Sequence, residues 1–270
     1  MGDLVWHRWL PPGHAPAPGA PPLVLLHGGS GSWTHWVKNI APLLDAGRTV
    51  LAPDMPGFGQ SPLPADGADA DSMAAPLIDG LRALLGQQGQ AVCDLAGFSF
   101  GGLTAALMLA QAPQLARRLV LVGAPAMGVA PDGQYTLQAW RHLPTAHAQL
   151  AAHRHNLGAL MLHDKRLIDD VALQIHVHNV QRDRAPRYRR RLARTDILAR
   201  TLPAIACPVY AIYGEHDAIY RNYLPALEAA YIRNAPTLRK FTLIAGAGHW
   251  VQYEAPGAFL GALLAALDGA

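Results

Sequence analysis

Short apolar runs recur along the chain, and each is followed by glycine, proline or polar residues. Apolar runs of about four to eight residues between turn residues are typical of strands that are buried on both faces of a sheet. Residues 4–10 instead alternate loosely between apolar and polar positions. The buried strands predicted in this way cover residues 22–26, 48–52, 91–96, 119–122, 209–213 and 241–244.

Helical patterns lie between several of these strands. They predict helices over residues 72–85, 102–112, 220–231 and 256–267. The last of these has proline in its first turn, where the missing N–H removes no helical hydrogen bond. Strands that alternate with helices favour a mostly parallel sheet flanked by helices on both faces, which is an α/β fold.

The alternation stops between residues 128 and 202, where a helical pattern rich in arginine, histidine and glutamine replaces it. We interpret this segment as a helical lid inserted between two strands. The predicted organisation is therefore a core of residues 1–127 and 203–270 with a lid of residues 128–202. A length of 270 residues, of which 51% are hydrophobic, suits one large core with such an insertion.

Charge is distributed unevenly, although the net charge is only +3. Residues 128–202 hold 12 Lys and Arg against 6 Asp and Glu, whereas the rest of the chain holds 10 against 13. The arginines lack the interleaved aromatic residues of a nucleic-acid groove, so no nucleic-acid partner is expected. The basic run at residues 187–191 is by default a solvated face, but Arg189 or Arg190, if it pointed inward, would pair with the carboxylate of an anionic substrate.

Other features of the composition exclude further classes. The chain has no apolar window of about 18 residues, so no membrane span is predicted. Residues 1–12 lack the pattern of a signal peptide. Cys93 and Cys207 are isolated, and we expect buried thiols in a reducing, cytoplasmic protein. Seven of the 13 histidines lie in the lid segment without an HExxH motif, so no metal site is expected.

The sequence GFSFG at residues 97–101 stands between a predicted strand and a predicted helix. In this context a G-x-S-x-G pentapeptide places its serine on a strained turn at the end of the sheet, against the N-terminus of the helix. The flanking glycines leave room where a Cβ atom would collide with that turn. Ser99 is therefore the predicted nucleophile.

A serine nucleophile needs a base that takes its proton and an acid that orients the base. Asp217 closes the sequence GEHD directly after the strand predicted at 209–213, and His249 follows the strand predicted at 241–244. Both residues thus lie at the carboxyl ends of strands, where parallel sheets form their ligand sites. Asp217 is also placed to cap the helix that follows it. We predict Asp217 as the acid and His249 as the base.

The sequence HGGSGSW at residues 27–33 supplies the remaining element of such a site. Its glycines let the loop approach a substrate oxygen and donate a backbone N–H, for which Gly29 is the candidate. The backbone N–H of Phe100, at the start of the helix after Ser99, is the second candidate donor. These two groups form the predicted oxyanion hole.

Together the motifs resemble those of the α/β-hydrolase superfamily over nearly the whole chain. The motifs are HGGSGSW at 27–33, DMPGFGQS at 54–61, GFSFGG at 97–102, GEHD at 214–217 and GAGHWVQYEAP at 246–256. The resemblance implies the α/β-hydrolase fold and a cofactor-free hydrolase with a serine, acid, histidine order along the chain. Its serine separates the chain from the dehalogenase and epoxide hydrolase branches, which use an aspartate nucleophile.

Within the superfamily, the chain is most similar to small lidded esterases and to hydrolases that cleave carbon–carbon bonds in ring-fission products. The sequence around His249 resembles the second group, which commonly carries asparagine where this chain has Phe98. In these families the histidine at the position of His27 braces the oxyanion loop. Asp94, within a strand, is expected to be a buried structural group, and Trp250 is a candidate for packing or for substrate contact.

The sequence thus predicts a serine hydrolase that cleaves a small to medium carboxylic ester through an acyl-enzyme. An alternative enzyme would cleave a carbon–carbon bond in a vinylogous diketo acid with the same residues and a lid arginine. A hypothesis from another class is an inactive relative that serves as a binding module, against which the complete Ser–Asp–His set argues. The expected partner is a small-molecule substrate, which is anionic if a lid arginine faces the site.

Overall fold

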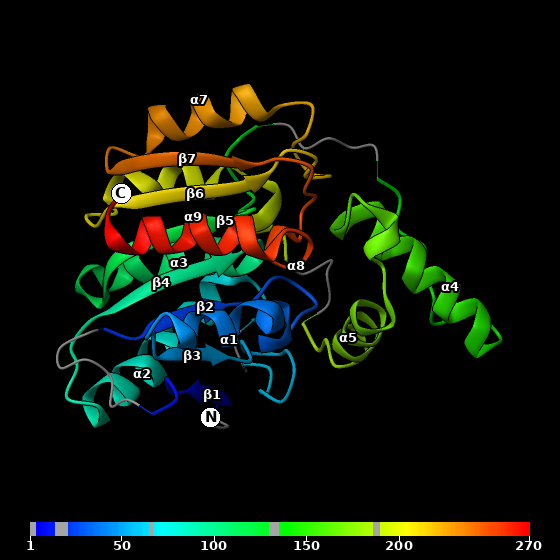
Figure 1. The fold of residues 1–270 in the computed structure, drawn as a ribbon, viewed down its shortest axis with the longest axis horizontal. Helices are drawn as coiled ribbons and strands as arrows, with labels where there is room; N and C mark the ends of the chain where they lie inside the picture. The colour runs from blue at the N-terminus through cyan, green and yellow to red at the C-terminus, as the bar shows by residue number, and fades with distance from the viewer. Residues whose placement is uncertain (1–3, 14–20, 65–66, 130–134, 186–189) are drawn as a thin grey trace.

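A computed structural model of the protein describes residues 4–13, 21–64, 67–129, 135–185 and 190–270. These residues form one seven-stranded sheet with the strand order β1-β3-β2-β4-β5-β6-β7 (Figure 1). Neighbouring strands are parallel except β1 and β3, which are antiparallel. The prediction of a mostly parallel sheet is confirmed. The strands are β1 (Trp6–Trp9), β2 (Leu23–Leu26), β3 (Val50–Pro53), β4 (Cys93–Phe98), β5 (Ala116–Val122), β6 (Val209–Gly214) and β7 (Leu238–Ile244).

Helices cover both faces of the sheet because the side chains of each buried strand alternate between the two faces. In β2, Leu23 and Leu25 pack into one hydrophobic core, and Val24 and Leu26 pack into the other. The first core lies under α1 (Val37–Asp45), α8 (Val251–Glu254) and α9 (Pro256–Asp268). The second core lies under α2 (Ala70–Gln87), α3 (Phe100–Gln111) and α7 (Leu224–Asn234).

The structure shifts the bounds of several predicted elements by a few residues, and two of these shifts have a clear physical reason. The helix expected over residues 220–231 begins at Leu224, with Pro225 in its first turn, where a missing N–H is tolerated. Strand β7 begins at Leu238 rather than at residue 241. The two charged residues at its start do not interrupt it, because β7 is an edge strand whose side chains reach solvent.

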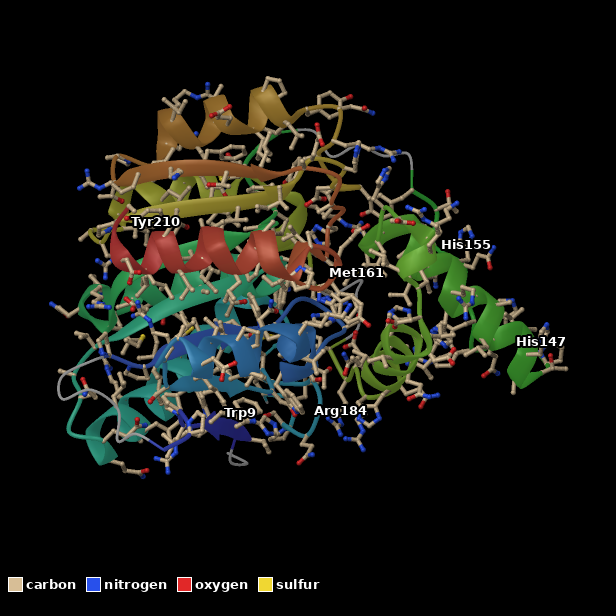
Figure 2. All side chains as sticks on the ribbon, viewed as in Figure 1. Trp9, His147, His155, Met161, Arg184 and Tyr210 are labelled. Atoms are coloured by element: carbon tan, nitrogen blue, oxygen red, sulfur yellow. The ribbon has the colours of Figure 1, made fainter. Side chains whose placement is uncertain are left out.

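Residues 128–202, called the insertion below, leave the core after β5 and return before β6. Figure 1 shows α4 and α5 beyond the end of the sheet at which α8 lies. Met161 and Arg184, labelled in Figure 2, lie where the insertion meets the core. There the Trp250 backbone N–H donates to the Met161 carbonyl at 2.7 Å, and Arg184 Nη1 donates to the Gly59 carbonyl at 3.0 Å. The helices of the insertion are α4 (Ala146–Asn156), α5 (Asp170–Gln181) and α6 (Ile197–Thr201).

Three residues with predicted structural roles lie in the core. Cys93 and Cys207 are buried free thiols, as predicted. Asp94 is fully buried and accepts hydrogen bonds from the Arg117 guanidinium at 2.7 and 2.8 Å, which confirms its structural role. None of the helices in the described ranges is long and apolar enough to cross a membrane.

Candidate active site

Ser99 lies on a strained turn between β4 and α3. Its backbone has φ 51° and ψ −120°, a conformation that costs free energy in any residue with a Cβ atom. The turn is tight enough that a Cβ atom on Gly97 would lie 2.5 Å from the Gly101 carbonyl oxygen. A Cβ atom on Gly101 would collide with the His27 carbonyl oxygen. The two glycines of the motif are therefore required by backbone contacts.

Ser99, His249 and Asp217 form one chain of hydrogen bonds. His249 Nε2 lies 2.9 Å from Ser99 Oγ, and His249 Nδ1 lies 2.8 Å from Asp217 Oδ2. Because the carboxylate can only accept, Nδ1 carries the imidazole proton and Nε2 is left to accept the proton of the Ser99 hydroxyl. Asp217 is fully buried, and His249 is nearly so. The arrangement can therefore move a proton from Ser99 to His249.

The second oxygen of Asp217 has a separate partner. Asp217 Oδ1 accepts a hydrogen bond from the Ile219 backbone N–H at 2.9 Å, so the residue caps the turn after β6 while it contacts His249. The predicted helix cap is wrong, because α7 begins only at Leu224 with Tyr223 at its N-cap, and Asp217 caps a turn instead. Its role as the acid stays a prediction. This second bond also fixes which oxygen faces the imidazole.

The loop after β2 lies beside the Ser99 turn because β2 pairs with β4, with Leu26 opposite Gly97. His27 supports this loop: Nδ1–H donates to the Gly28 carbonyl at 2.8 Å, and Nε2 accepts from the Met55 N–H at 2.9 Å. Burial lowers the pKa of His27 to about 4, so the imidazole that makes these two bonds is neutral. His27 therefore has the bracing role that the resemblance implies.

The two candidate oxyanion donors belong to residues at one cavity. Gly29 and Phe100 both line the cavity that contains Ser99 and His249. Within the described part of the chain, neither the Gly29 N–H nor the Phe100 N–H donates to a protein acceptor. Phe100 is the first residue of α3, so its N–H belongs to the group that a helix leaves without an internal acceptor. Their role as donors to an oxygen bound at Ser99 stays a prediction.

A cavity of about 1370 Å³ opens onto the Ser99 hydroxyl, and the insertion forms much of its wall. Aromatic and aliphatic side chains of the insertion, among them Trp140 and Leu160, line it together with His176. Enclosure lowers the pKa of His176 to about 4, so this wall carries a neutral imidazole near neutral pH. A space of this size accommodates a small organic molecule.

His35 is a cavity residue that the sequence analysis does not identify. Its Nδ1 accepts a hydrogen bond from the Gly28 N–H at 3.2 Å, and burial lowers its pKa well below the ordinary value. The neutral ring therefore carries its proton on Nε2. A Cβ atom on Gly31 would collide with this imidazole, so the glycine of the loop makes room for it. In the sequence, the glycine-rich spacing of the loop indicates that a group packs closely against it, but it does not show that this group is His35.

Glu254 is a second residue without a distinct sequence signal beyond its place in the motif at 246–256. Its Oε2 accepts from the backbone N–H groups of Gly248 at 2.7 Å and His163 at 3.1 Å. Its Oε1 accepts from the Asp164 N–H at 2.6 Å. One carboxylate thus joins the insertion to the residue that precedes His249.

The three residues predicted to contact substrate differ in where they lie in the structure. Arg190 lines the cavity beside Gly29, and its side chain is 6% exposed. Trp250 needs correction as a substrate contact: it is fully buried, its Nε1–H donates to the His35 carbonyl at 2.8 Å, and its ring stacks on Tyr253. Its position in the core is that of a packing residue. Arg189 lies outside the described residues.

The described residues contain no group of three or more His, Cys, Asp or Glu side chains arranged to hold a metal ion.

Sequence comparisons identify relatives along most of the chain. The profile of the alpha/beta hydrolase family matches residues 23–262. The 2-hydroxymuconate semialdehyde hydrolase of Pseudomonas sp. strain CF600 is 29% identical over 268 residues, which cover 92% of this chain and 88% of that protein. The dihydrolipoyllysine-residue acetyltransferase component of the acetoin cleaving system of Pseudomonas putida is 31% identical over 249 residues. That match covers 88% of this chain but only 60% of that protein.

A solved structure shows the same arrangement of sheet and helices. An esterase from Rhodococcus sp. ECU1013 has a TM-score of 0.76 and 21% identity, with 98% of this chain and 94% of that chain covered. At this identity the likeness shows the fold alone, which is the α/β-hydrolase fold. With that fold and a family profile that spans residues 23–262, the chain belongs to the alpha/beta hydrolase family.

Proposed function

We propose that this protein is a serine hydrolase that cleaves small to medium carboxylic esters through an acyl-enzyme. The observation that carries the proposal is the chain of contacts from Ser99 Oγ to His249 at 2.9 Å and from His249 to Asp217 at 2.8 Å. A hydroxyl, an imidazole and a buried carboxylate in this order are the groups that activate a serine for attack on a carbonyl carbon.

In the first half of the reaction, Ser99 Oγ attacks the ester carbonyl while His249 Nε2 takes the hydroxyl proton. Asp217 stabilises the imidazolium that forms and holds its orientation. The N–H groups of Gly29 and Phe100 donate to the oxyanion of the tetrahedral intermediate, and each such donor contributes on the order of 10²–10³ in rate. His249 then gives its proton to the departing alkoxide, which leaves as the alcohol.

In the second half, water replaces the alcohol. His249 takes a proton from the water, whose oxygen attacks the acyl carbon, and the same two N–H groups hold the second oxyanion. Collapse of this intermediate returns the proton to Ser99 Oγ and releases the carboxylic acid. No cofactor takes part in this scheme.

We assign to residues 128–202 the role of a lid over this site. The cavity of about 1370 Å³ lies between the core and these residues, which supports the assignment. Its size supports substrates with small to medium acyl and alcohol groups, and its aromatic and aliphatic lining supports groups that are largely apolar.

A second candidate function is hydrolysis of a carbon–carbon bond in a vinylogous diketo acid. The similarity to the 2-hydroxymuconate semialdehyde hydrolase of Pseudomonas sp. strain CF600 and the position of Arg190 in the cavity wall favour it. Phe98 counts against it, because hydrolases of that branch commonly carry asparagine before the nucleophile. The two functions share the serine, histidine and aspartate, so only substrates distinguish them.

Two measurements test the proposal. A fluorophosphonate probe should label the wild-type protein at Ser99 and should not label Ser99→Ala, whereas a binding module would not react. Turnover is then compared on p-nitrophenyl esters of increasing chain length and on a ring-fission diketo acid. Labelling without ester turnover, together with cleavage of the diketo acid, would replace the ester assignment with the second candidate.

A further inference from the structure

A buried ion pair lies in the cavity wall next to the oxyanion loop. Arg190 Nη1 donates to Asp183 Oδ2 at 3.0 Å and to the Ala185 carbonyl at 2.6 Å, and Nη2 donates to Ser30 Oγ at 3.1 Å. The Ser30 hydroxyl in turn donates to Asp183 Oδ2 at 2.6 Å. The side chains of Arg190 and Asp183 are only 6% and 10% exposed.

The second oxygen of the carboxylate is also occupied. Asp183 Oδ1 accepts from the Ala185 backbone N–H at 2.9 Å, so both oxygens are held in place. The Arg190 guanidinium lies over the rings of Phe58 and Phe100, at 5.4 and 5.8 Å from their centroids. The pair is thus fixed by hydrogen bonds on one side and by packing on the other.

Both members of the pair line the cavity that contains Ser99. A bound carboxylate would be attracted by Arg190, but it would also meet the negative charge of Asp183 in the same wall. In a poorly solvated site, the attraction to Arg190 and the repulsion from Asp183 are both large and oppose each other. The free energy that the carboxylate loses when it leaves water is not reduced by the ion pair. An uncharged group in the same place carries no such penalty.

We propose that Asp183 sets the charge preference of the site: by compensating Arg190, it makes the cavity favour substrates that are uncharged near the oxyanion loop. The inference rests on the proposed ester hydrolysis and adds the substrate class to it. Asp183 is a specificity-determining residue in this scheme, because it acts on the substrate through the charge of Arg190 and its own.

The proposal predicts opposite effects on substrate preference for substitutions of the two residues. Asp183→Asn leaves the cation of Arg190 uncompensated and should move the preference toward anionic substrates. Arg190→Gln leaves the anion of Asp183 uncompensated and should move the preference toward neutral ones. A general loss of packing would affect both substrates in the same way and so would not produce this pattern.

The test uses two esters that differ by one charge, the p-nitrophenyl esters of monomethyl adipate and of the adipate half-acid. The ratio of kcat/KM for the anionic ester to kcat/KM for the neutral ester is measured for each protein. Wild type should favour the neutral ester. Asp183→Asn should raise the ratio at least ~30-fold, which is about 2 kcal/mol, and Arg190→Gln should lower it about tenfold or more.

The matched control is Asp164→Asn, which removes one negative charge from another Asp–Arg pair of the insertion. Asp164 pairs with Arg166 at 2.7 Å, but Arg166 is 90% exposed and neither residue lines the cavity. This control should leave the ratio within about twofold of wild type, because solvent screens the removed charge.

A ratio that does not change in Asp183→Asn, or that moves in the same direction in both variants, overturns the proposal. If thermal denaturation shows that Asp183→Asn does not fold, the decrease expected in Arg190→Gln still decides the question. Failure of the proposed function looks different: wild type would then hydrolyse neither ester and would not react with the fluorophosphonate probe.

Discussion

Replacing Asp217 with asparagine exchanges one acceptor atom of a buried carboxylate for a donor. Asp217 Oδ1 accepts from the Ile219 N–H at 2.9 Å, and the asparagine oxygen will keep this bond because an N–H group needs an acceptor. The amide NH₂ then takes the place of Oδ2, which lies 2.8 Å from His249 Nδ1. Nδ1 must accept, and the imidazole proton moves to Nε2.

The proton on Nε2 would face Ser99 Oγ, 2.9 Å away, where a base is required. The variant should therefore keep its fold and lose a factor of roughly 10³–10⁴ in kcat, which is about 4–5.5 kcal/mol of transition-state stabilisation. The assay is ester hydrolysis at substrate saturation, with the rate of fluorophosphonate labelling as a second measure of the activated serine. Circular dichroism and thermal denaturation check the fold.

The matched control is Asp94→Asn, which alters another fully buried aspartate, within β4. Its carboxylate lies within 4 Å of three arginines, Arg117, Arg48 and Arg118, whose side chains are 39%, 17% and 21% exposed. Loss of its charge should therefore cost about 3 kcal/mol of stability. Its kcat should remain within about twofold of wild type. If Asp217→Asn retained a tenth of wild-type activity, or if Asp94→Asn were the inactive variant, the acid would have to be reassigned.

Three further changes test the site. Ser99→Ala should lose probe labelling and lower kcat by about 10⁴ or more without loss of stability, and a tenth of the activity remaining would exclude Ser99 as the nucleophile. Glu254→Ala should cost about 1–3 kcal/mol in thermal unfolding and slow the labelling of Ser99, because the N–H of Gly248, which precedes His249, and two N–H groups of the insertion lose their acceptor. Glu215→Ala, which removes the acceptor of one N–H group only, is its control, and equal effects of the two would contradict the reasoning. Gly97→Ala should destabilise the protein by more than about 2 kcal/mol in chemical denaturation, because its Cβ atom would lie 2.5 Å from a backbone oxygen; normal stability would show that the turn adapts.

Much of the fold and the candidate triad can be predicted from the sequence because their signals are local. An apolar run between turn residues indicates a buried strand wherever it occurs, and Gly97 is required by the carbonyl of Gly101, four residues along the chain. Asp217 and His249 follow their strands directly, so the rule that sites form at the carboxyl ends of parallel strands brings them near Ser99. No local sequence pattern predicts the strand order that places these three residues next to one another.

The tertiary structure alone decides what surrounds these residues. Trp250 is adjacent to His249 in sequence, yet its indole points into the core and donates to His35, 215 residues away. Glu254 holds backbone groups of the insertion that are about 90 residues distant. Such partners depend on how separate elements pack, and periodicity carries no information about them.

The charge of the cavity shows most clearly how the information in the sequence differs from that in the tertiary structure. The sequence determined that the insertion is rich in arginine, with an excess of positive charge that suggests an anionic substrate. Folding brings Asp183 to within 2.6 Å of Ser30, 153 residues away, and places the same carboxylate oxygen against Arg190. A count of charges along the chain cannot reveal this compensation, because the energy of a buried charge depends on its distance to the nearest opposite charge and on the exclusion of water.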